Sequence, residues 1–497
     1  MQPFWLFIRQ YSKTMAITKQ ARTNAGVAQY NGTWGKDEVI HLLNRTTFGC
    51  RVEDVDYFVG KTMSQAIDEL LNVDYTPPSP PINDYNGRNI DPIVPAGQTW
   101  INNYNGQFNG ARRNSFKRWW AGQMINQDRT IREKMVMFWH NHFATEMQVY
   151  AWANFAYTQN ALLRANCLKD FRSLVKDITL DPAMLVYLNG ERNTKTAPDE
   201  NYSRELMELF TLGKGPDSKY TESDVIEGAK ILTGWRINKS NGQVYFQANR
   251  HDTTDKIFSS YFGSTIVYGK TGNAGEEEID DLLTMIFRQN EVAKYIARKL
   301  YRWFVYYDID EATEANVITP LANTFRSNNY QIKPVVEQLL KSEHFFDKVN
   351  RGALIKSPVD YTIGISRFFD ISYPPASDFV NQYLAWNINV SATSIQQQNI
   401  GDPPSVAGWP AYYQVPQYHE LWLNSDTLPK RNQISDYLIQ FGYNVGSYKF
   451  KIDTLHFAKK FTNVADPVKF IDDLLQYMHT LEVEQAQKDY MRSILLS

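Results

Sequence analysis

Cysteine is scarce in this sequence, which has only Cys50 and Cys167 among its 497 residues. Two distant cysteines in no metal-like or redox-like spacing do not predict a disulfide framework, although one disulfide between them stays open. Long apolar runs are also missing, because no segment approaches the roughly 20 residues of a membrane-spanning helix. The N-terminal apolar run Pro3–Ile8 is too short for a secretory signal. No clear export signal is therefore expected, and the compartment stays open.

The sequence also lacks an excess of charge of either sign. Its 52 Lys and Arg residues against 54 Asp and Glu residues give a net charge of −2. A nucleic-acid-binding surface, which normally shows a basic excess or stripe, is not predicted. Several motifs are missing as well: GxSxG, GxxxxGK[ST], GxGxxG after a strand, and HExxH. A nucleophile-elbow serine hydrolase, a P-loop NTPase, a dinucleotide enzyme and a zincin are therefore unexpected.

What the sequence does contain is helical periodicity over most of its length, with 14% aromatic residues. The pattern predicts a mainly α protein, a large multi-helix body with a minor β-hairpin or flap from segments 243–247 and 264–268. Residues 1–33 are expected to form a poorly ordered tail. Residues 34–497 are expected to form a single large helical domain, with a Pro- and Asn-rich connector near 74–98.

The densest group of ionisable residues lies in Pro198–Gly213, which is predicted to be one helix. Glu200, Arg204 and Glu208 are each four residues apart and share a face, with Glu205 beside that row. The opposite stripe is apolar and would be buried: Tyr202, Leu206, Leu209 and Phe210. By composition alone, a solvated charged face is favoured over the wall of a site by about two to one.

Histidines are few, and His140 and His142 stand out in MVMFWHNHFATE. On a helix their imidazoles would point about 200° apart. At a helix end, where the chain changes direction, they could converge on one metal ion. Glu133 lies on the same helical face as His140, so a carboxylate and an imidazole could share a cavity. The alternative is that one histidine packs between Trp139 and Phe143 and the other binds a backbone carbonyl.

A second histidine candidate, His251, precedes Asp252 in the polar segment NRHDTTDK. It follows a predicted strand and lies in a loop, where functional residues concentrate. Asp252 could orient an imidazole or bind a cation. An Asx-turn at Asp252 is at least as favoured by the local sequence.

Taken together, the motifs resemble the bacterial family known as domain of unknown function 1800, over roughly residues 38–440. The resemblance implies a large helical protein without an established reaction. Members are often exported and often encoded beside proteins resembling the sulfatase- or phosphatase-like family of unknown function 1501, which makes such a protein an expected partner. The matching blocks occur in this order: HLLNRTTFG (41–49), REKMVMFWHNHFAT (132–145), DPAMLVYLNG (181–190), PDENYSRELMELFTLG (198–213), YTESDVIEGAKILTGW (220–235), HDTTDK (251–256), IKSPVDY (355–361) and PPSVAGWP (403–410).

The polar positions of these blocks suggest which residues belong to one pocket. Charged groups are seldom fully buried unless they are paired, so their convergence would indicate a site. The resemblance places the following residues in the blocks: Arg45, Arg132, His140, Asn141, His142, Asp199, Glu200, Asn201, Arg204, Glu205, Glu208, Trp235, His251 and Asp252.

The first hypothesis for function is a metal-dependent enzyme, hydrolytic rather than an oxygenase, with a zinc or iron ion as cofactor. A carboxylate would act as general base on a metal-bound water, and an arginine would hold an anionic group. The assigned roles are metal ligation by His140, His142, His251 and Asp252, general-base catalysis by Glu205 or Glu208, and anion binding by Arg204 or Arg132.

The second hypothesis is a non-catalytic protein of the cell envelope that binds a glycan or a protein partner. Its ligand would be a carbohydrate or a peptide. The Pro-, Trp- and Tyr-rich segment Pro403–Tyr418 could stack on sugar rings or dock a partner. The polar blocks would then be internal ion-pair networks, such as Glu200–Arg204–Glu208.

Overall fold

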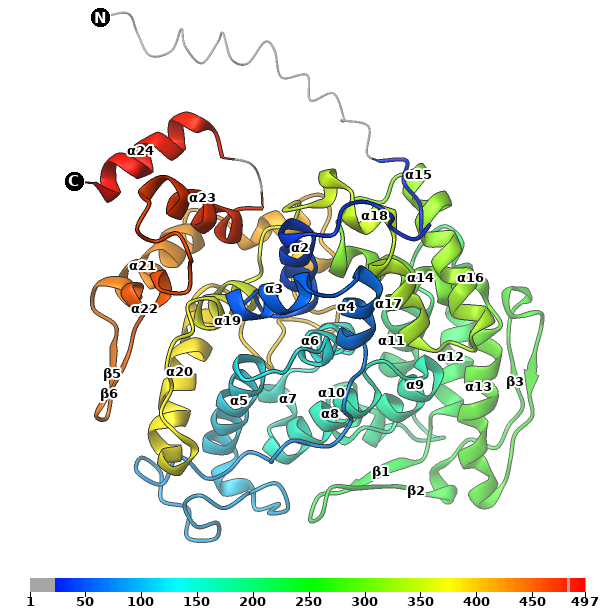
Figure 1. The fold of residues 1–497 in the computed structure, drawn as a ribbon. Helices are drawn as coiled ribbons and strands as arrows, with labels where there is room; N and C mark the ends of the chain where they lie inside the picture. The colour runs from blue at the N-terminus through cyan, green and yellow to red at the C-terminus, as the bar shows by residue number, and fades with distance from the viewer. Residues whose placement is uncertain (1–22, 481–482, 497) are drawn as a thin grey trace, which may run out of the picture.

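The computed structural model of the chain describes residues 23–480 and 483–496. These residues form a mainly helical body with three antiparallel two-stranded hairpins, which confirms the predicted fold class. Helices pack in several layers, and the hairpins lie at the edges of the body (Figure 1). Cys50 and Cys167 are both buried free thiols, so the disulfide left open by the sequence is not formed. No described helix is long and apolar enough to span a membrane.

The described part of the chain begins with an extended segment and three short helices. The Tyr30 amide donates a hydrogen bond to the carbonyl of Lys341 at 2.8 Å, which fastens residues near 30 to the body. Residues 1–22 of the predicted tail lie outside the described residues. Thr62 begins the third helix with a capping box, since its hydroxyl accepts from the Gln65 amide at 3.2 Å. The three helices are α2 (Lys36–Thr46), α3 (Val52–Val59) and α4 (Met63–Leu70).

The predicted connector near 74–98 contains neither a helix nor a strand, and buried ion pairs fasten it to helix α5 (Asn109–Ile125). The Arg112 guanidinium binds Asp91 at 2.9 Å, with both side chains fully buried. Arg118 binds Asp84 of the same connector at 2.8 Å. A segment whose carboxylates are paired inside the body is held in one conformation, because separating the pairs would leave buried charges unpaired.

Helix α5 packs along α20 (Phe379–Ile395), although these helices are far apart in the sequence. Gly122 makes the contact close, because a Cβ atom at this position would lie 2.7 Å from the Trp386 ring. Helix α19 (Pro358–Phe368) packs against both helices. A small second core lies beyond α20, against the hairpin of β5 (Tyr443–Val445) and β6 (Tyr448–Phe450): Ile371, Ala385, Ala392, Ile434, Leu438, Val445, Phe450 and Ile452.

Helix α6 (Arg132–His142) runs through the centre of the body and packs on α8 (Ala153–Asn166). It ends at His142, so both histidines lie in its last turn, at a helix end as the sequence suggested. Because both residues are still helical, their side chains leave the helix in different directions. Three further short helices follow in this region: α7 (Met147–Tyr150), α9 (Phe171–Thr179) and α10 (Pro182–Tyr187).

The segment predicted as one helix over Pro198–Gly213 is a short α-helix, α11 (Asn201–Glu205), that continues directly as a π-helix, η3 (Leu206–Thr211). Gly213 adopts φ +76° and terminates the segment, as expected for a glycine after a helix. The next helix, α12 (Glu222–Ile231), is capped by the side chain of Thr221. The apolar stripe is confirmed, because Tyr202, Leu206 and Phe210 are buried and Leu209 is half-buried.

Both predicted β segments form strands, but they do not pair with each other. Strand β2 (Gln243–Phe246) pairs with β1 (Trp235–Asn238), and β4 (Ile266–Val267) pairs with β3 (Lys256–Ile257). Each predicted segment therefore finds its partner a few residues earlier in the chain. A third hairpin, which the sequence did not indicate, joins β5 (Tyr443–Val445) to β6 (Tyr448–Phe450).

The C-terminal half is again helical, and α14 is its central helix. Helix α14 packs against α16 and α17. Its C-terminal end lines the cavities described below. Its amphipathic pattern, with a broad apolar face, explains why it is buried on one side. The helices of this half are α13 (Glu278–Phe287), α14 (Asn290–Phe304), α15 (Glu311–Thr313), α16 (Thr319–Ser327), α17 (Ile332–Leu340), α18 (Glu343–Phe346), α21 (Thr427–Gln440), α22 (Thr454–Ala458), α23 (Pro467–Met478) and α24 (Gln485–Leu495).

Candidate functional site

His140 and His142 lie on different faces of α6. The His140 ring packs between Trp120 and Trp409, with ring centroids 5.0 and 5.9 Å away, and burial lowers its pKa to about 4. The Nε2 of His142 donates to the Phe210 carbonyl at 3.1 Å. The expected convergence of the two imidazoles is therefore not found, because a regular helix turns them apart.

The π-helix η3 connects the charged helix of the sequence motif to α6 and α14. A π-helix changes the backbone hydrogen-bonding pattern to i→i+5, as shown by the Leu212 amide that donates to Met207 at 2.9 Å. Two of its carbonyls accept side-chain donors from other helices: Phe210 from His142 of α6, and Leu209 from the Tyr295 hydroxyl of α14 at 2.9 Å. The motif therefore positions His142 through a backbone contact and not through its own carboxylates.

His251 belongs to a fully buried polar cluster on the side of the β3–β4 hairpin. Its Nε2 lies 3.0 Å from Glu278, and the Lys256 ammonium binds the other oxygen of the same carboxylate at 2.6 Å. Burial would raise the pKa of Glu278, but the contacts with His251 and Lys256 hold it below its ordinary value. The other ring nitrogen of His251 lies 3.1 Å from the Thr233 hydroxyl. Each charge in this cluster has a partner.

Asp252 forms an Asx-turn, the alternative that the local sequence favoured at least equally. Its carboxylate accepts the Thr254 amide at 2.8 Å and the Thr254 hydroxyl at 2.5 Å. Burial would raise its pKa, but these hydrogen bonds keep the pKa below the usual aspartate value. Asp252 contacts no imidazole; the carboxylate that orients His251 is Glu278.

Arg204 lies in a surface ion-pair network and not in a cavity. It binds Glu200 at 2.9 Å, as the sequence predicted, and Glu222 of α12 at 2.9 Å. These contacts raise the pKa of the guanidinium, with the Glu222 hydrogen bond as the main cause. Glu208 does not join this network, because it pairs with Lys214 at 2.5 Å. Of the predicted Glu200–Arg204–Glu208 network, the pair Glu200–Arg204 is therefore formed and the pair Arg204–Glu208 is not.

Glu205 is half-buried and makes no hydrogen bond or ion pair with the other described residues. Burial, followed by the nearby charge of Glu208, raises its pKa. Its charge also acts on Tyr187 and Tyr220, whose pKa values burial raises to about 12. Glu205 is therefore influenced by Glu208, Lys214, Arg204 and these tyrosines, and by no histidine among the described residues.

The side chains of Arg132 and Glu133 lie 3.5 Å apart near the start of α6, and each also binds a further partner. Arg132 donates to the Asp74 carbonyl at 2.7 Å and so holds the connector against the helix. Glu133 accepts the guanidinium of Arg164 at 3.0 Å inside the core. The expected cavity shared by Glu133 and His140 is not formed, because this arginine occupies the carboxylate.

The predicted metal and catalytic residues are therefore distributed over several separate places. Within residues 23–480 and 483–496, no group of three or more His, Cys, Asp or Glu side chains could hold a metal ion. A zinc or iron cofactor stays a prediction, with no assembled set of ligands among these residues. Four of the eight blocks, 41–49, 132–145, 355–361 and 403–410, instead contribute lining residues to two adjoining cavities.

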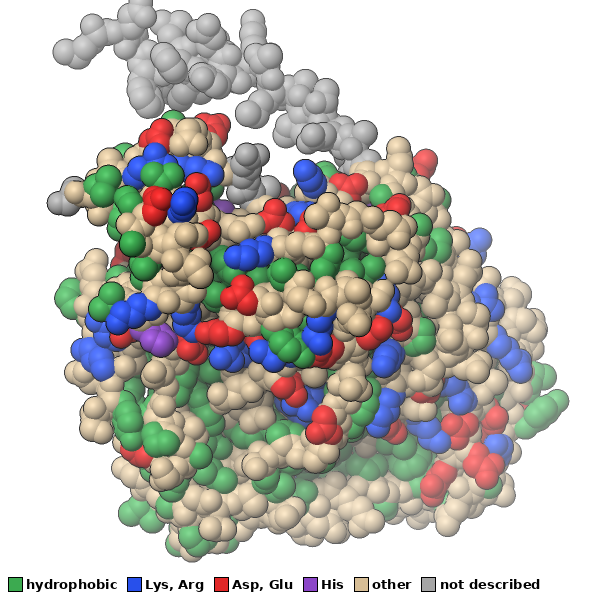
Figure 2. Space-filling view, in the orientation of Figure 1, with side chains coloured by type: hydrophobic (Ala, Val, Ile, Leu, Met, Phe, Trp, Pro, Cys, Tyr) green, Lys and Arg blue, Asp and Glu red, His purple; other side chains and the backbone are tan. Residues whose placement is uncertain are grey.

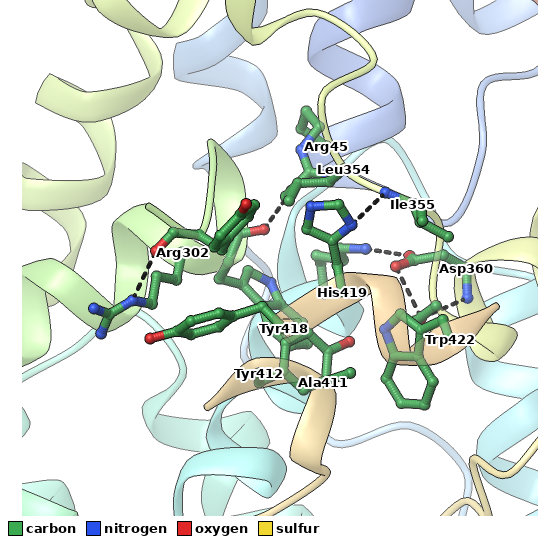
Figure 3. A pocket seen from close by; sticks show the side chains of 14 residues that line it. Arg45, Arg302, Leu354, Ile355, Asp360, Ala411, Tyr412, Tyr418, His419 and Trp422 are labelled. Carbon is green, nitrogen blue, oxygen red and sulfur yellow. Dashed lines mark hydrogen bonds and ion pairs between the residues drawn. The ribbon is translucent and has the colours of Figure 1, made fainter. Parts of the chain in front are cut away.

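The first cavity lies where α2, α6, the end of α14, the start of α19 and the segment 410–422 come together. It has room for about 30 Å³, roughly one water molecule, and includes positions from three sequence blocks. Figure 3 shows the His419 ring at its centre, with Arg45, Arg302 and Asp360 around it. The lining residues are Arg45, Lys134, Arg302, Trp303, Tyr307, Leu354, Ile355, Ser357, Asp360, Ala411, Tyr412, Tyr418, His419 and Trp422.

Positive charge exceeds negative charge in the lining of this cavity. The Lys134 ammonium pairs with Asp360, the single carboxylate among the lining residues. Arg45 donates to the carbonyls of Trp303 and Phe304 at the end of α14, at 2.5 and 2.8 Å. Arg302 uses only its Nε for a backbone carbonyl at 3.1 Å. Neither arginine is paired with a carboxylate among the described residues, so two positive charges remain uncompensated.

His419 adds a neutral hydrogen-bond donor to the same cavity. Its Nδ1 accepts the Ile355 backbone amide at 3.3 Å, as Figure 3 shows. A backbone amide can only donate, so Nδ1 is unprotonated and Nε2 carries the proton of the neutral ring. This Nε2 is buried without a partner among the described residues. Burial, assisted by the charge of Arg45, lowers the pKa of His419 to about 4.

Aromatic rings form the remaining wall. The rings of Trp303 and Tyr412 lie 4.7 Å apart, and those of Tyr307 and Tyr418 stack at 5.1 Å. The guanidinium of Arg302 lies 5.5 Å from the Tyr418 ring. This arrangement combines cations with aromatic faces, which suits a ligand that has both an anionic group and a planar or ring-shaped part.

A second cavity adjoins the first and has room for about 20 Å³, again roughly one water molecule. The two cavities share Arg302, Trp303 and Tyr412, so these side chains form the partition between them. The second cavity reaches α6 at His142, the residue held by the π-helix. Its lining residues are Phe138, Asn141, His142, Lys299, Arg302, Trp303, Ala407, Tyr412 and Tyr413.

Sequence reasoning missed most of the charged residues of these cavities. Lys134 and Asp360 lie inside the blocks 132–145 and 355–361, but they were not selected as candidate site residues. Their signal was available, since a lysine and an aspartate in two separate motifs are potential partners. Arg302 and His419 lie outside the blocks, and no local pattern in the sequence marks them.

The molecular surface does not share the charge imbalance of the first cavity. On the face shown in Figure 2, Lys and Arg side chains alternate with Asp and Glu side chains. This mixture agrees with the net charge of −2. The excess of cations is therefore a local property of the cavity.

The fold and the cavities define a large helical protein with a cation-lined, aromatic cavity. A family model described as "protein of unknown function (DUF1800)" matches residues 41–496. The chain therefore belongs to this family, which confirms the resemblance inferred from the motifs. No curated protein and no solved structure matches the chain.

Proposed function

We propose that this protein binds an anionic ligand in the first cavity. The main observation is that Arg45 and Arg302 have positive charges that no carboxylate of the lining balances. The one carboxylate in the lining, Asp360, is paired with Lys134. Phosphate, sulfate and carboxylate groups are the natural partners of guanidinium groups. The Nε2–H of His419 would donate a further hydrogen bond.

The aromatic wall supports a ligand with a ring next to its anionic group, such as an acidic sugar, which would enter by moving the aromatic side chains apart, because the cavity itself has room for only about 30 Å³. Trp303 belongs to α14 and Tyr307 to the loop that follows it, whereas Tyr412 and Tyr418 come from the segment 410–422. This segment overlaps Pro403–Tyr418, for which the sequence suggested sugar stacking or partner docking. The geometry therefore favours the binding hypothesis over metal-dependent hydrolysis.

Calorimetric titration of the full chain tests the proposal. The probes are inorganic sulfate, inorganic phosphate, glucose 6-phosphate and glucuronate, with glucose as the uncharged control. We expect the anionic sugars to bind more tightly than the inorganic ions, because their rings add contact with the aromatic wall. Glucose should give no measurable heat.

Arg302→Gln is the decisive variant, and Arg88→Gln is its charge-matched control because Arg88 is exposed and outside the cavity. Loss of a charged hydrogen bond costs about 1.5–3 kcal/mol, so Arg302→Gln should weaken anion binding at least about tenfold. Arg88→Gln should bind as the wild type does. An equal loss of anion affinity in both variants would show that the anion responds to the net charge of the protein and not to the cavity. That result would overturn the proposal.

A further inference from the structure

A groove that is separate from the two cavities opens to solvent beside the first half of α5. It has room for about 570 Å³, which lies within the roughly 300–1,000 Å³ of ligand-binding clefts in proteins. None of the described residues that line it belongs to either cavity. The lining comes from the connector, from the short turn η1 (Gly106–Phe108) and α5, from α7, and from the loop after α20. We call it the α5 groove.

The floor of the α5 groove is one face of helix α5. Gly110, Asn114 and Lys117 follow the spacing i, i+4, i+7, so they point to the same side of the helix. Gly110 is exposed, and a Cβ atom at this position would meet no other atom within 4 Å. The space above Gly110 is therefore open because the helix has no side chain there.

The walls of the α5 groove are fastened to α5 by separate contacts. The guanidinium of Arg113 donates to the Met147 carbonyl at 3.0 Å and so holds α7. The Lys117 ammonium binds Asp402 at 2.5 Å and the side-chain oxygen of Asn399 at 2.8 Å, which holds the loop after α20. The connector is held by the buried ion pairs described above. Because the walls are already in place, little conformational entropy is lost when a ligand binds.

Carboxamide side chains form most of the polar lining. They are exposed and come from the connector, from η1 and α5, and from α7: Asn89, Gln107, Asn114 and Gln148. None of these side-chain amides forms a hydrogen bond with another described residue. A carboxamide has two N–H donors and an acceptor oxygen, so it suits hydroxyl groups, which both donate and accept.

The remaining lining argues against a nucleic acid or a peptide with large apolar side chains. Lys117 and Asp402 neutralise each other, which leaves one guanidinium, that of Arg113. A nucleic-acid site normally has a larger basic excess. Of the described residues in the lining, only Phe108 and Ala111 have apolar side chains, so there is no deep apolar pocket for an anchor residue. A ligand that is neutral and rich in hydroxyl groups fits this lining best.

We propose that the α5 groove binds a neutral oligosaccharide through the hydroxyl groups of its sugars. The four carboxamides bind hydroxyls from three sides, and the other N–H groups of Arg113 donate to sugar oxygens. The ring of Phe108 contacts the C–H face of one sugar. The α5 groove and the proposed anion site share no residue, so the inference goes beyond the proposed function and does not rest on it.

The experiment begins with the full chain, fluorescently labelled, on an array of neutral and acidic oligosaccharides. We expect neutral oligosaccharides among those that bind. Calorimetric titration with the tightest neutral oligosaccharide then gives its affinity for the wild type and for variants. Binding of no neutral oligosaccharide, or of acidic ones alone, would overturn the proposed ligand.

Gly110→Leu is the decisive variant, because its side chain fills the open space above α5 and should abolish measurable binding. The unfolding temperature should not fall, since leucine is a better helix former than glycine. Gly60→Leu is the matched control. Gly60 is exposed outside the α5 groove, and a Cβ atom there would make an ordinary contact, 3.6 Å from the Tyr57 carbonyl. Equal affinities in these two variants would overturn the assignment of the site.

Two further variants complete the test. Gln148→Ala removes one exposed carboxamide without filling the α5 groove, so the affinity for the neutral oligosaccharide should fall about twofold to tenfold. An unchanged affinity would contradict hydroxyl binding by the carboxamides. Arg302→Gln, which alters the first cavity, should bind the neutral oligosaccharide as the wild type does. A loss of affinity in Arg302→Gln equal to that in Gly110→Leu would contradict a separate site.

Discussion

The His251 cluster and the first cavity contain the same three chemical groups: an imidazole, an ammonium and one carboxylate. In the cluster, Glu278 contacts both His251 and Lys256, and all three side chains are fully buried. In the cavity, Asp360 contacts Lys134, while His419 binds a backbone amide. Two arginines then add positive charge that no carboxylate balances.

The difference teaches that the balance of charge, more than the density of ionisable residues, distinguishes the two places. A cluster whose charges cancel inside the core is explained by stability alone. A cavity with a net positive charge attracts a ligand of negative charge. The predictions below therefore disturb the balanced cluster and the unbalanced cavity separately.

The largest effect is expected for Glu278→Ala. This change leaves the Lys256 ammonium buried without its carboxylate, which should reduce the free energy of unfolding by about 3–5 kcal/mol. Urea denaturation followed by circular dichroism measures the loss. The double variant Glu278→Leu/Lys256→Met removes both charges and should recover most of it. A loss below about 1 kcal/mol for Glu278→Ala would show that the cluster is not a stabilising unit.

A pH series separates the two regions. The pKa of His419 is about 4 in the folded protein and about 6.5 when unfolded, so the unfolded state binds more protons between these values. Stability should therefore fall as pH falls from about 6.5 to 4, by up to about 1.4 kcal/mol per pH unit. The pKa of Glu278 is below its ordinary value, so its contribution is lost only at lower pH, as pH falls through the folded pKa.

Since other groups also titrate, the quantity to measure is a difference. Burial raises the pKa of Asp181 to about 7, which opposes the histidine effect in the wild type. The difference in unfolding free energy between wild type and His419→Gln cancels this contribution. It should change steadily between pH 6.5 and 4 and be flat above pH 7. A difference that does not depend on pH would contradict the neutral, buried imidazole.

The third effect compares matched lysines of the two regions. Lys134→Met leaves Asp360 as an unpaired negative charge in the cavity, so glucose 6-phosphate affinity should fall roughly tenfold to a hundredfold. Lys256→Met removes a buried lysine outside the cavity and should destabilise the protein without changing that affinity. Calorimetry on the two variants, at a temperature where both are folded, gives the comparison. An equal loss of affinity would mean that the cavity is not the binding site.

The smallest effect is expected at the charged helix that dominates the sequence. Arg204→Gln breaks a partly exposed network with Glu200 and Glu222, and such pairs contribute about 0–1 kcal/mol. The unfolding free energy should change by less than about 1 kcal/mol, and anion affinity should stay the same. A larger loss of affinity would restore the sequence-based role of Arg204 as an anion-binding residue.

The sequence predicted the helical architecture well because periodicity reports burial directly. The stripe Tyr202, Leu206 and Phe210 was correct for this reason. The π-helix and the third hairpin were missed. Both depend on contacts from distant residues, such as the donor that His142 supplies to Phe210.

The candidate site was predicted less well, because side-chain convergence is a tertiary property. The sequence grouped His140 with His142 by proximity, but helix geometry separates them. It could not show that Arg302 and His419, 117 positions apart, line the same cavity. Charge density drew attention to Pro198–Gly213, where Arg204 and Glu208 are already paired.

The most direct test of the central claim is the anomalous diffraction of a crystal soaked in selenate, a heavy analogue of sulfate. We expect the strongest selenium peak inside the first cavity, within hydrogen-bonding distance of Arg302 and of the His419 Nε2. The peak should be absent from crystals of Arg302→Gln. Selenate bound only at the outer surface, with no peak in this cavity, would contradict the assignment of an anion-binding site.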